Sequence, residues 1–306
     1  MLTKYAIDTG HLVETQGEEG NVLVFVNPDE EERRRLEIEL KVDEHTLTSA
    51  LDPDELSRLE FEPEHLALIF KRPKNYQGAE HFLFRVTSMG LFLFKNRLIV
   101  VASENDPLFD GKLFARVRSL PDVMLKLMAR SIVHFLQHLK VINLISDELE
   151  TKLSRSMENR YLLNLFSLEK SLVFYLNAIH TNGVVVGKLK YNVSKLALGQ
   201  EESEFLDDIG IENDQCYKLA EIYSNVLSNL MDARASIVNN NLNVLMKTLN
   251  LIVIAIMVPT FVVSTFSMNV PMPFNIGHSL WSFWGIMGLA TLSMVGLLYI
   301  WRRKRL

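Results

Sequence analysis

A long uncharged stretch near the carboxyl end is the feature that most constrains the fold of this chain of 306 residues. From Thr248 through Trp301 the sequence contains no Asp, Glu, Lys or Arg. Two apolar segments coincide with this stretch, at about 245–266 and 280–301, and each has the roughly 20 residues that a helix needs to cross a hydrocarbon core of about 30 Å. The sequence therefore predicts a transmembrane hairpin.

Basic residues border this hairpin on one side of the membrane. Lys247 opens the first span, basic residues follow the second span at 302–305, and the loop between the spans has none. By the positive-inside rule we expect a multi-pass protein of the plasma (inner) membrane with both termini in the cytoplasm. The start Met-Leu-Thr-Lys has no apolar signal-peptide core, which agrees with a large cytosolic amino-terminal part.

The charge balance of that amino-terminal part excludes one class of partner. The chain has 32 basic and 37 acidic side chains, and because five of the basic ones lie at 247–306, residues 1–246 carry a formal charge of −10. An acidic surface repels nucleic acid and attracts cations, so we expect no nucleic-acid partner. The chain has one cysteine, Cys216, and therefore cannot form an intrachain disulfide.

Residues 1–112 are predicted to form a cytosolic mixed α/β domain. Short runs rich in β-branched and aromatic residues predict strands, among them a hairpin of 82–86 and 91–101 around Ser88-Met89-Gly90. Residues 113–244 read as a helical stalk, because apolar residues recur there with a period of 3.6. A long helix is predicted from Pro121 and a second one at 161–177, with Gly183-Val-Val-Val-Gly187 interrupting it.

A third long helix is expected to begin at Asn213. It should run unbroken into the first span, because no Pro or Gly occurs between Ile211 and Met257. Residues 245–306 would then form the transmembrane hairpin and a basic cytoplasmic tail. The predicted fold class is an α+β cytosolic domain with a long helical stalk plus two C-terminal transmembrane helices.

One face of the first span combines polar with apolar side chains. At spacings of three and four residues this stripe comprises Asn239, Asn243, Met246, Asn250, Val253, Met257, Thr260 and Ser264. Polar groups in apolar helices usually face a protein interior or a water-filled cavity. A helix–helix contact is the alternative, because Asn, Ser and Thr also hydrogen-bond to neighbouring helices.

The order of residues along this span, with Ser267-Met268-Asn269 at its end and Met272-Pro273 after it, resembles the CorA family of divalent-cation transporters. The hallmark of that family is Gly-Met-Asn at the end of the first of two C-terminal spans. The resemblance extends to the basic carboxyl terminus and, more loosely, to residues 50–62 of the soluble part.

The resemblance implies a CorA-like funnel, a homopentamer that sits in membrane lipid and conducts divalent cations. Ser267, Met268 and Asn269 would form the selectivity mouth, where Asn269 would hold hydrated Mg²⁺ through the water shell of the ion. The pore and its gate, which would close by dewetting, would be lined by Asn243, Met246, Leu249, Val253, Met257 and Thr260. The resemblance implies no enzyme activity and no cofactor, with Mg²⁺ as the transported ion and a candidate regulator at unlocated cytosolic sites.

The chain departs from the family pattern at the mouth, because Ser267 replaces the hallmark glycine. A serine is tolerated there in helical backbone and strained if the position needs positive φ. For Asn269, a helix C-terminal cap is the alternative role. The family resemblance favours Mg²⁺ influx. It leaves open that the same architecture transports Zn²⁺, Co²⁺ or Ni²⁺, that transport is outward, or that the protein is a non-conducting membrane-anchored scaffold or sensor.

Other polar groups favour a structural role over a site. His134 and His138 lie four residues apart and could share a metal, although two polar positions on an amphipathic helix explain them better. The acidic run at 201–208 could sense Mg²⁺, but such a run is more often a solvated face. A membrane-tethered enzyme would need a catalytic motif, and we find none in the sequence.

Overall fold

A computed structural model describes residues 1–17, 20–76, 82–104, 107–155, 159–196, 198–268 and 280–304. The chain forms two compact units, Met1–Met231 and Asp232–Leu306, which divide within its longest helix. The predicted domain boundaries after residues 112 and 244 stay predictions.

A seven-stranded sheet forms the amino-terminal part of the first unit. Its strand order is β2-β1-β3-β7-β6-β5-β4. The pair β3 and β7 is parallel and the other neighbours are antiparallel. The strands are β1 (Leu2–Asp8), β2 (His11–Glu14), β3 (Val22–Val26), β4 (Arg58–Phe61), β5 (His65–Pro73), β6 (Val86–Phe94) and β7 (Leu98–Ala102). Because β5 is buried along its whole length, the sheet must be covered on both faces.

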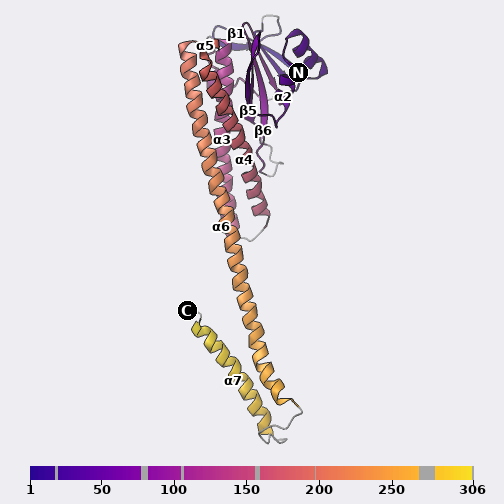
Figure 1. The fold of residues 1–306 in the computed structure, drawn as a ribbon, viewed down its shortest axis with the longest axis vertical. Coiled ribbons are helices and arrows are strands. Elements are labelled where there is room, and N and C mark those ends of the chain that lie inside the picture. Colours follow the sequence, from indigo (N-terminus) through magenta and orange to yellow (C-terminus); the bar gives the residue numbers. More distant parts are fainter. Residues whose placement is uncertain are drawn as a thin grey trace. The chain divides into compact units, whose positions relative to one another are not determined.

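Strand side chains alternate between these two faces. One set packs with α2 (Glu44–Leu51), which follows the short α1 (Glu30–Arg34) and a π-helical turn at Arg35–Glu39. The other set packs against the long helices α3 (Leu120–Arg155) and α4 (Asn159–Tyr191), and a 3₁₀ turn at Lys112–Phe114 precedes α3. Figure 1 shows α3 and α4 along one side of the sheet and α2 on the other.

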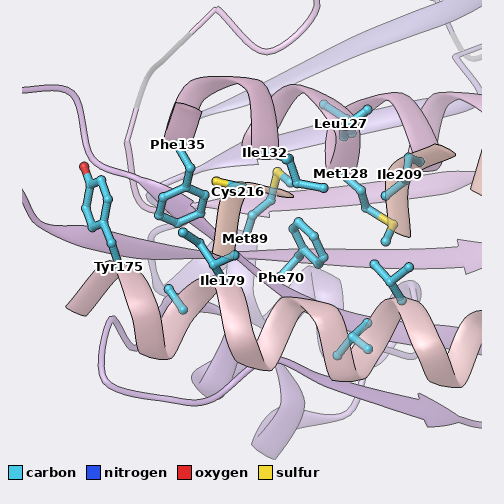
Figure 2. Close-up of a cluster of buried hydrophobic side chains, with 14 of the residues drawn as sticks. Phe70, Met89, Leu127, Met128, Ile132, Phe135, Tyr175, Ile179, Ile209 and Cys216 are labelled. Carbon is cyan, nitrogen blue, oxygen red and sulfur yellow. The ribbon is translucent and has the colours of Figure 1, made fainter. Parts of the chain in front are cut away.

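The main core lies where α3, α4 and the first part of α6 (Gln200–Phe266) meet the sheet. Each of these helices buries an apolar face there, as a 3.6-residue period predicts. Figure 2 shows side chains from all four elements in contact range, with Phe70 and Met89 from the sheet, Ile132 and Phe135 from α3, Tyr175 and Ile179 from α4, and Ile209 and Cys216 from α6.

Among the described residues, three helical segments are long and apolar enough to cross a membrane, Arg160–Tyr191, Gln200–Phe266 and Trp281–Arg303. The extent of burial distinguishes these segments. The most apolar stretch of α4 is 39% buried inside the structure, whereas those of the other two segments are each 6% buried. Asn182 of α4 is fully buried and hydrogen-bonds to the backbone of Lys71 in β5. We therefore assign α4 to the core, and the apolar parts of α6 and α7 (Leu280–Lys304) to the membrane.

Two expectations about glycine-containing segments are wrong. Gly90 lies inside β6, and the turn of the hairpin is at 95–97, between β6 and β7. A Cβ on Gly90 would approach the Cβ of Ala50 to 2.6 Å, so this glycine allows α2 to pack on the sheet. Similarly, α4 continues through Gly183 and Gly187, and a Cβ on Gly183 would lie 2.8 Å from Nδ2 of Asn213.

The last long helix begins earlier than predicted. A short α5 (Val193–Leu196) precedes it, and α6 starts at Gln200 rather than at Asn213. The side chain of Glu202 accepts a hydrogen bond from the Gly199 N–H at 2.8 Å, which satisfies one of the free donors at the start of the helix. Gly210 lies within the helix and does not end it.

Candidate functional site

The stripe predicted on the first span lies on α6, in the second unit. Its apolar members are exposed in the single chain, with Met246 at 54%, Val253 at 44% and Met257 at 62%, and Leu249, which the resemblance adds to the pore lining, is 52% exposed. Their spacing of three and four residues places them along one side of the helix. A continuous apolar face of this kind must be covered by lipid or by another chain.

Threonine hydroxyls on both spans bond to their own helix. Thr260 Oγ1 donates to the carbonyl of Ile256 at 2.7 Å, and Thr291 Oγ1 of α7 donates to the carbonyl of Met287 at 3.0 Å. Such bonds allow a hydroxyl to lie in an apolar helix without an outside partner. These groups therefore do not indicate which face of the helix meets water.

The amides on α6 differ from the hydroxyls. Within the described part of the chain, the side chains of Asn243 and Asn250 make no hydrogen bond. A carboxamide has two N–H donors and an acceptor oxygen, and Asn250 lies inside the charge-free run, where an unpaired polar group is costly. The partner of Asn250 therefore lies outside the described residues.

The last turn of α6 accommodates Ser267. Its N–H donates to the carbonyl of Ser264 at 3.1 Å, and its Oγ donates to the carbonyl of Val263 at 3.0 Å. Ser267 is not among the described non-glycine residues that have positive φ. The serine therefore fits its backbone without strain.

The rest of the predicted mouth is described in part. Met268 follows the helix and is 57% exposed. Asn269 and the loop through residue 279 lie outside the described residues. The role assigned to Asn269 stays a prediction.

A groove of about 560 Å³ lies between the end of α6 and α7. Ala290 of α7 is 5% exposed, and small side chains at such a crossing allow helices to approach closely. Thr260, which the resemblance assigns to the pore, lines this groove in the single chain together with Ser264 of the stripe. The lining residues are Pro259, Thr260, Val263, Ser264, Ser267, Met287, Ala290, Thr291 and Met294.

Comparison with known families gives a match to the family described as "CorA-like Mg2+ transporter protein", over residues 20–304. The chain belongs to this family. The "Cobalt/magnesium transport protein CorA" of Methanocaldococcus jannaschii is 24% identical over 291 residues, which are 91% of this chain and 88% of that relative. The complete structure of the CorA magnesium transporter from the same organism has a TM-score of 0.83 at 20% identity, and the match covers 99% of this chain and 98% of that one. The full-length CmaX protein has a TM-score of 0.71 at 14% identity, with 99% of this chain and 97% of that one covered.

These matches confirm the predicted CorA-like fold class, an α+β domain with long helices and two C-terminal helices apolar enough to span a membrane. As a member of the CorA family of transporters, the protein is a membrane protein. At these identities the structural likeness shows the fold alone. The assignment to the family rests on the match over residues 20–304.

In this CorA-family chain, His134 and His138 form a hydrogen-bonded pair. Their Nε2 atoms are 3.0 Å apart, and His138 Nδ1 is 2.6 Å from the hydroxyl of Tyr175. Burial lowers the pKa of both rings to about 4, and the charges of Arg72 and Arg130 add to the effect on His134. Both rings are therefore neutral at pH 7. Among the described residues no three His, Cys, Asp or Glu side chains gather as metal ligands.

The acidic run at the start of α6 forms contacts with other elements. Glu201 pairs with Arg118, and Glu202 accepts a hydrogen bond from Ser119 just before α3. Asp207 pairs with Lys190 of α4 at 2.9 Å. These contacts attach the start of α6 to its neighbours in the first unit and favour the structural role of the run.

The sequence reasoning missed one polar grouping in the first unit. Arg72, Lys112 and Arg130 line the same pocket although they come from three separate segments. No motif or spacing links segments that lie so far apart in the sequence, so the fold was needed to find them.

Proposed function

We propose that this chain forms a homopentamer that conducts hydrated divalent cations, with Mg²⁺ influx across the plasma membrane as its main activity. The observation that carries the proposal is the contrast on α6 between the threonine hydroxyls, which bond to their own helix, and the amide of Asn250, which has no partner among the described residues. Around a symmetry axis, copies of Asn243 and Asn250 would face a water-filled path, which is where polar groups of membrane helices are usually found.

Several chains are needed because one hairpin encloses no path. The apolar windows of α6 and α7 are each 6% buried in the single chain, so most of their surface is available to lipid and to other copies. Lys247, Arg302 and Arg303 border the spans and support a multi-pass topology with both termini in the cytoplasm. In this arrangement the first unit, with its α/β domain and stalk helices, is cytosolic.

The proposed path has a polar mouth and an apolar gate. Amide oxygens of an Asn269 ring would hydrogen-bond to the waters of Mg²⁺, an ion that gives up its water shell reluctantly. Below the mouth formed by Ser267, Met268 and Asn269, apolar rings would close the path by dewetting. The lining that the resemblance assigns to the path would be Asn243, Met246, Leu249, Val253, Met257 and Thr260, and the amide of Asn250, unpaired among the described residues, adds that residue to it.

The membrane potential supplies the driving force, so we propose transport without catalysis and without a cofactor. Moving one charge through 100 mV is worth about 2.3 kcal/mol, so a divalent cation gains about 4.6 kcal/mol when it enters an inside-negative cell. This energy favours influx over efflux.

Ion entry into proteoliposomes tests the proposal. Vesicles that contain an indicator for each ion and an inside-negative potential should take up Mg²⁺, and Asn269→Ala should abolish the uptake. Asn177→Ala, the same change at an exposed position of α4, should leave uptake unchanged. The proposal fails if no divalent cation enters while the purified particle has the mass of five 35.1 kDa chains. A scaffold or sensor would then be the better explanation.

The choice of ion needs its own comparison, because the curated relative is named a cobalt/magnesium transport protein. Uptake of Mg²⁺, Co²⁺, Zn²⁺ and Ni²⁺ should be measured in parallel at equal concentration and potential. Mg²⁺ entry that exceeds the others at millimolar concentration supports the main proposal. If a transition metal enters and Mg²⁺ does not, the protein is still a cation-conducting pore, and its substrate is the transition metal.

A further inference from the structure

Lys71 places an amino group inside the first unit. It is 4% exposed and lies near the end of β5, paired with Ser88 of β6. Side chains two residues apart in a strand share a face of the sheet, so Lys71 lies on the face of Ile69, which packs with α2. The amino group therefore meets the segment that follows α2.

The hydrogen bonds of this amino group go to neutral acceptors. Nζ of Lys71 donates to the carbonyl of Pro53 at 2.7 Å and to the hydroxyl of Ser88 at 2.8 Å. Among the described residues no carboxylate forms an ion pair with it. An ammonium has three N–H groups, whereas a neutral amine has two and a lone pair. The neutral amine therefore keeps both hydrogen bonds and has its lone pair available.

The surroundings of Lys71 favour this neutral form. Burial lowers the pKa of Lys71 to about 8, against the opposing effect of the carboxylates of Asp52, Asp54 and Glu55. At pH 7 about 10% of the side chain is then neutral, compared with roughly 0.03% for a lysine with the ordinary pKa of 10.5. A neutral lysine amine is a nucleophile, and desolvation is one way in which proteins activate it.

A pocket of about 480 Å³ leads to Lys71. Lys71 lines it together with Pro53, the acceptor of one of its hydrogen bonds. The pocket lies at the edge of the sheet where β4 no longer covers β5, because the two strands pair only as far as Ile69. Since so little of Lys71 is exposed, a reagent that reaches Nζ must be small. Much of the lining is apolar and favours an uncharged reagent, with Leu83, Val86, Phe174 and Ala178.

We propose that Lys71 binds carbon dioxide covalently, as a carbamate. The lone pair of Nζ attacks the carbon atom of CO₂, the electron pair of one C–O π bond moves to oxygen, and the nitrogen loses one proton to water. The amine and CO₂ thus give a carbamate and H⁺, with no oxidation or reduction. The nitrogen keeps one N–H for the carbonyl of Pro53, and Arg85 and Lys170 line the pocket beside Asp54, so cationic groups are present for the negative product. The proposal concerns the first unit and does not rest on the transport activity.

Trapping the carbamate in the full-length protein in detergent tests this site. The protein is equilibrated with isotopically labelled CO₂ at a fixed dissolved concentration and treated with a trialkyloxonium salt, which converts a carbamate into a stable ester. Peptide mass spectrometry then locates the ester. At pH 7 we expect at least about tenfold more ester at Lys71 than at Lys74, because a larger fraction of the Lys71 amine is neutral. Lys74 is the internal control, since its Nζ is bound to the carboxylate of Glu104 at 2.8 Å and it does not line the pocket.

Two further conditions separate a site made by the fold from ordinary lysine chemistry. At constant CO₂, the ester at Lys71 should increase up to about pH 8 and level off above it, as titration of this amine predicts. In protein unfolded by urea, the preference for Lys71 over Lys74 should disappear, because the burial and the pocket are lost. The proposal is overturned if Lys71 carries no ester, if Lys74 carries as much, or if the preference persists in urea.

Discussion

Replacing Asn182 by alanine would test how the helical layer is attached to the sheet. The side chain of Asn182 is fully buried, accepts the N–H of Lys71 at 2.9 Å and donates to the carbonyl of Lys71 at 2.9 Å. It also accepts the hydroxyl of Ser57 at 2.7 Å. Because β4 pairs with β5 only as far as Ile69, Asn182 takes the place of a strand partner for Lys71.

The size of the effect follows from the groups left behind. Asn182→Ala leaves the N–H and the carbonyl of Lys71 buried without partners, and each such group costs about 1–3 kcal/mol. The expected loss is about 2–6 kcal/mol of the free energy that keeps β5 closed. Since about 1.4 kcal/mol is a factor of ten, amide exchange in β5 should accelerate by roughly 30-fold or more.

Hydrogen–deuterium exchange of peptides that cover His65–Pro73 measures this directly. Tryptophan fluorescence would not, because the tryptophans lie at 281, 284 and 301 in the second unit. Asn177→Ala is the control, an exposed asparagine of the same helix. If the two variants exchange alike in β5, the hydrogen bonds of Asn182 do not hold the layers together and the reasoning is wrong.

Other substitutions test separate parts of the structure. Gly187→Ala should raise the free energy of unfolding by up to about 1 kcal/mol, because alanine favours the helix and its Cβ meets no neighbour. Gly183→Ala should lower it, because its Cβ would approach Asn213. The melting temperatures of the two variants should therefore shift in opposite directions. The unchanged protein should lose stability as the pH falls from 6.5 to 4, because the unfolded His138 ring binds a proton before the folded ring does, and His138→Gln should reduce this loss. Chemical denaturation at pH 7 and pH 5 measures the free energy of unfolding of both proteins. An equal decrease in the two proteins would contradict the prediction. Met257→Asp should raise ion leak through liposomes if the gate is dry, and an unchanged leak would argue against a pore at this position. Ser267→Gly should leave Mg²⁺ uptake within about twofold, because the serine already fits its helix; a large gain in uptake would mean that its side chain obstructs the mouth.

The membrane part and the family were predictable from sequence for a physical reason. A span needs length and the absence of charge, and both are properties of a single segment that can be read without knowing the fold. The stripe on α6 was predictable for the same reason, since helical spacing alone places Met246 and Met257 on one side.

Tertiary contacts account for the parts that the sequence did not predict. Gly90 and Gly183 look like breaks in a strand and a helix, because a glycine lowers the local preference for either. Each is retained inside its element because another side chain, on Ala50 or Asn213, approaches where a Cβ would lie. The partners are distant in sequence, so no local pattern could identify them.

Asn182 and Asn250 differ in whether the described chain supplies their hydrogen-bond partners. In the first unit, Asn182 makes three hydrogen bonds to groups of the same chain. Asn213 donates to the carbonyl of Ile179 at 3.1 Å, while its buried Oδ1 has no partner among the described residues. These partners exist because the core of that unit closes within one chain. Asn250 has the same chemistry in a more apolar setting, and the described chain provides no partner for it. Hydroxyls such as that of Thr260 cannot show this difference, since they bond to their own helix in either case. The described residues supply no partner for Asn250, and an assembly of several copies around a hydrated path would supply one.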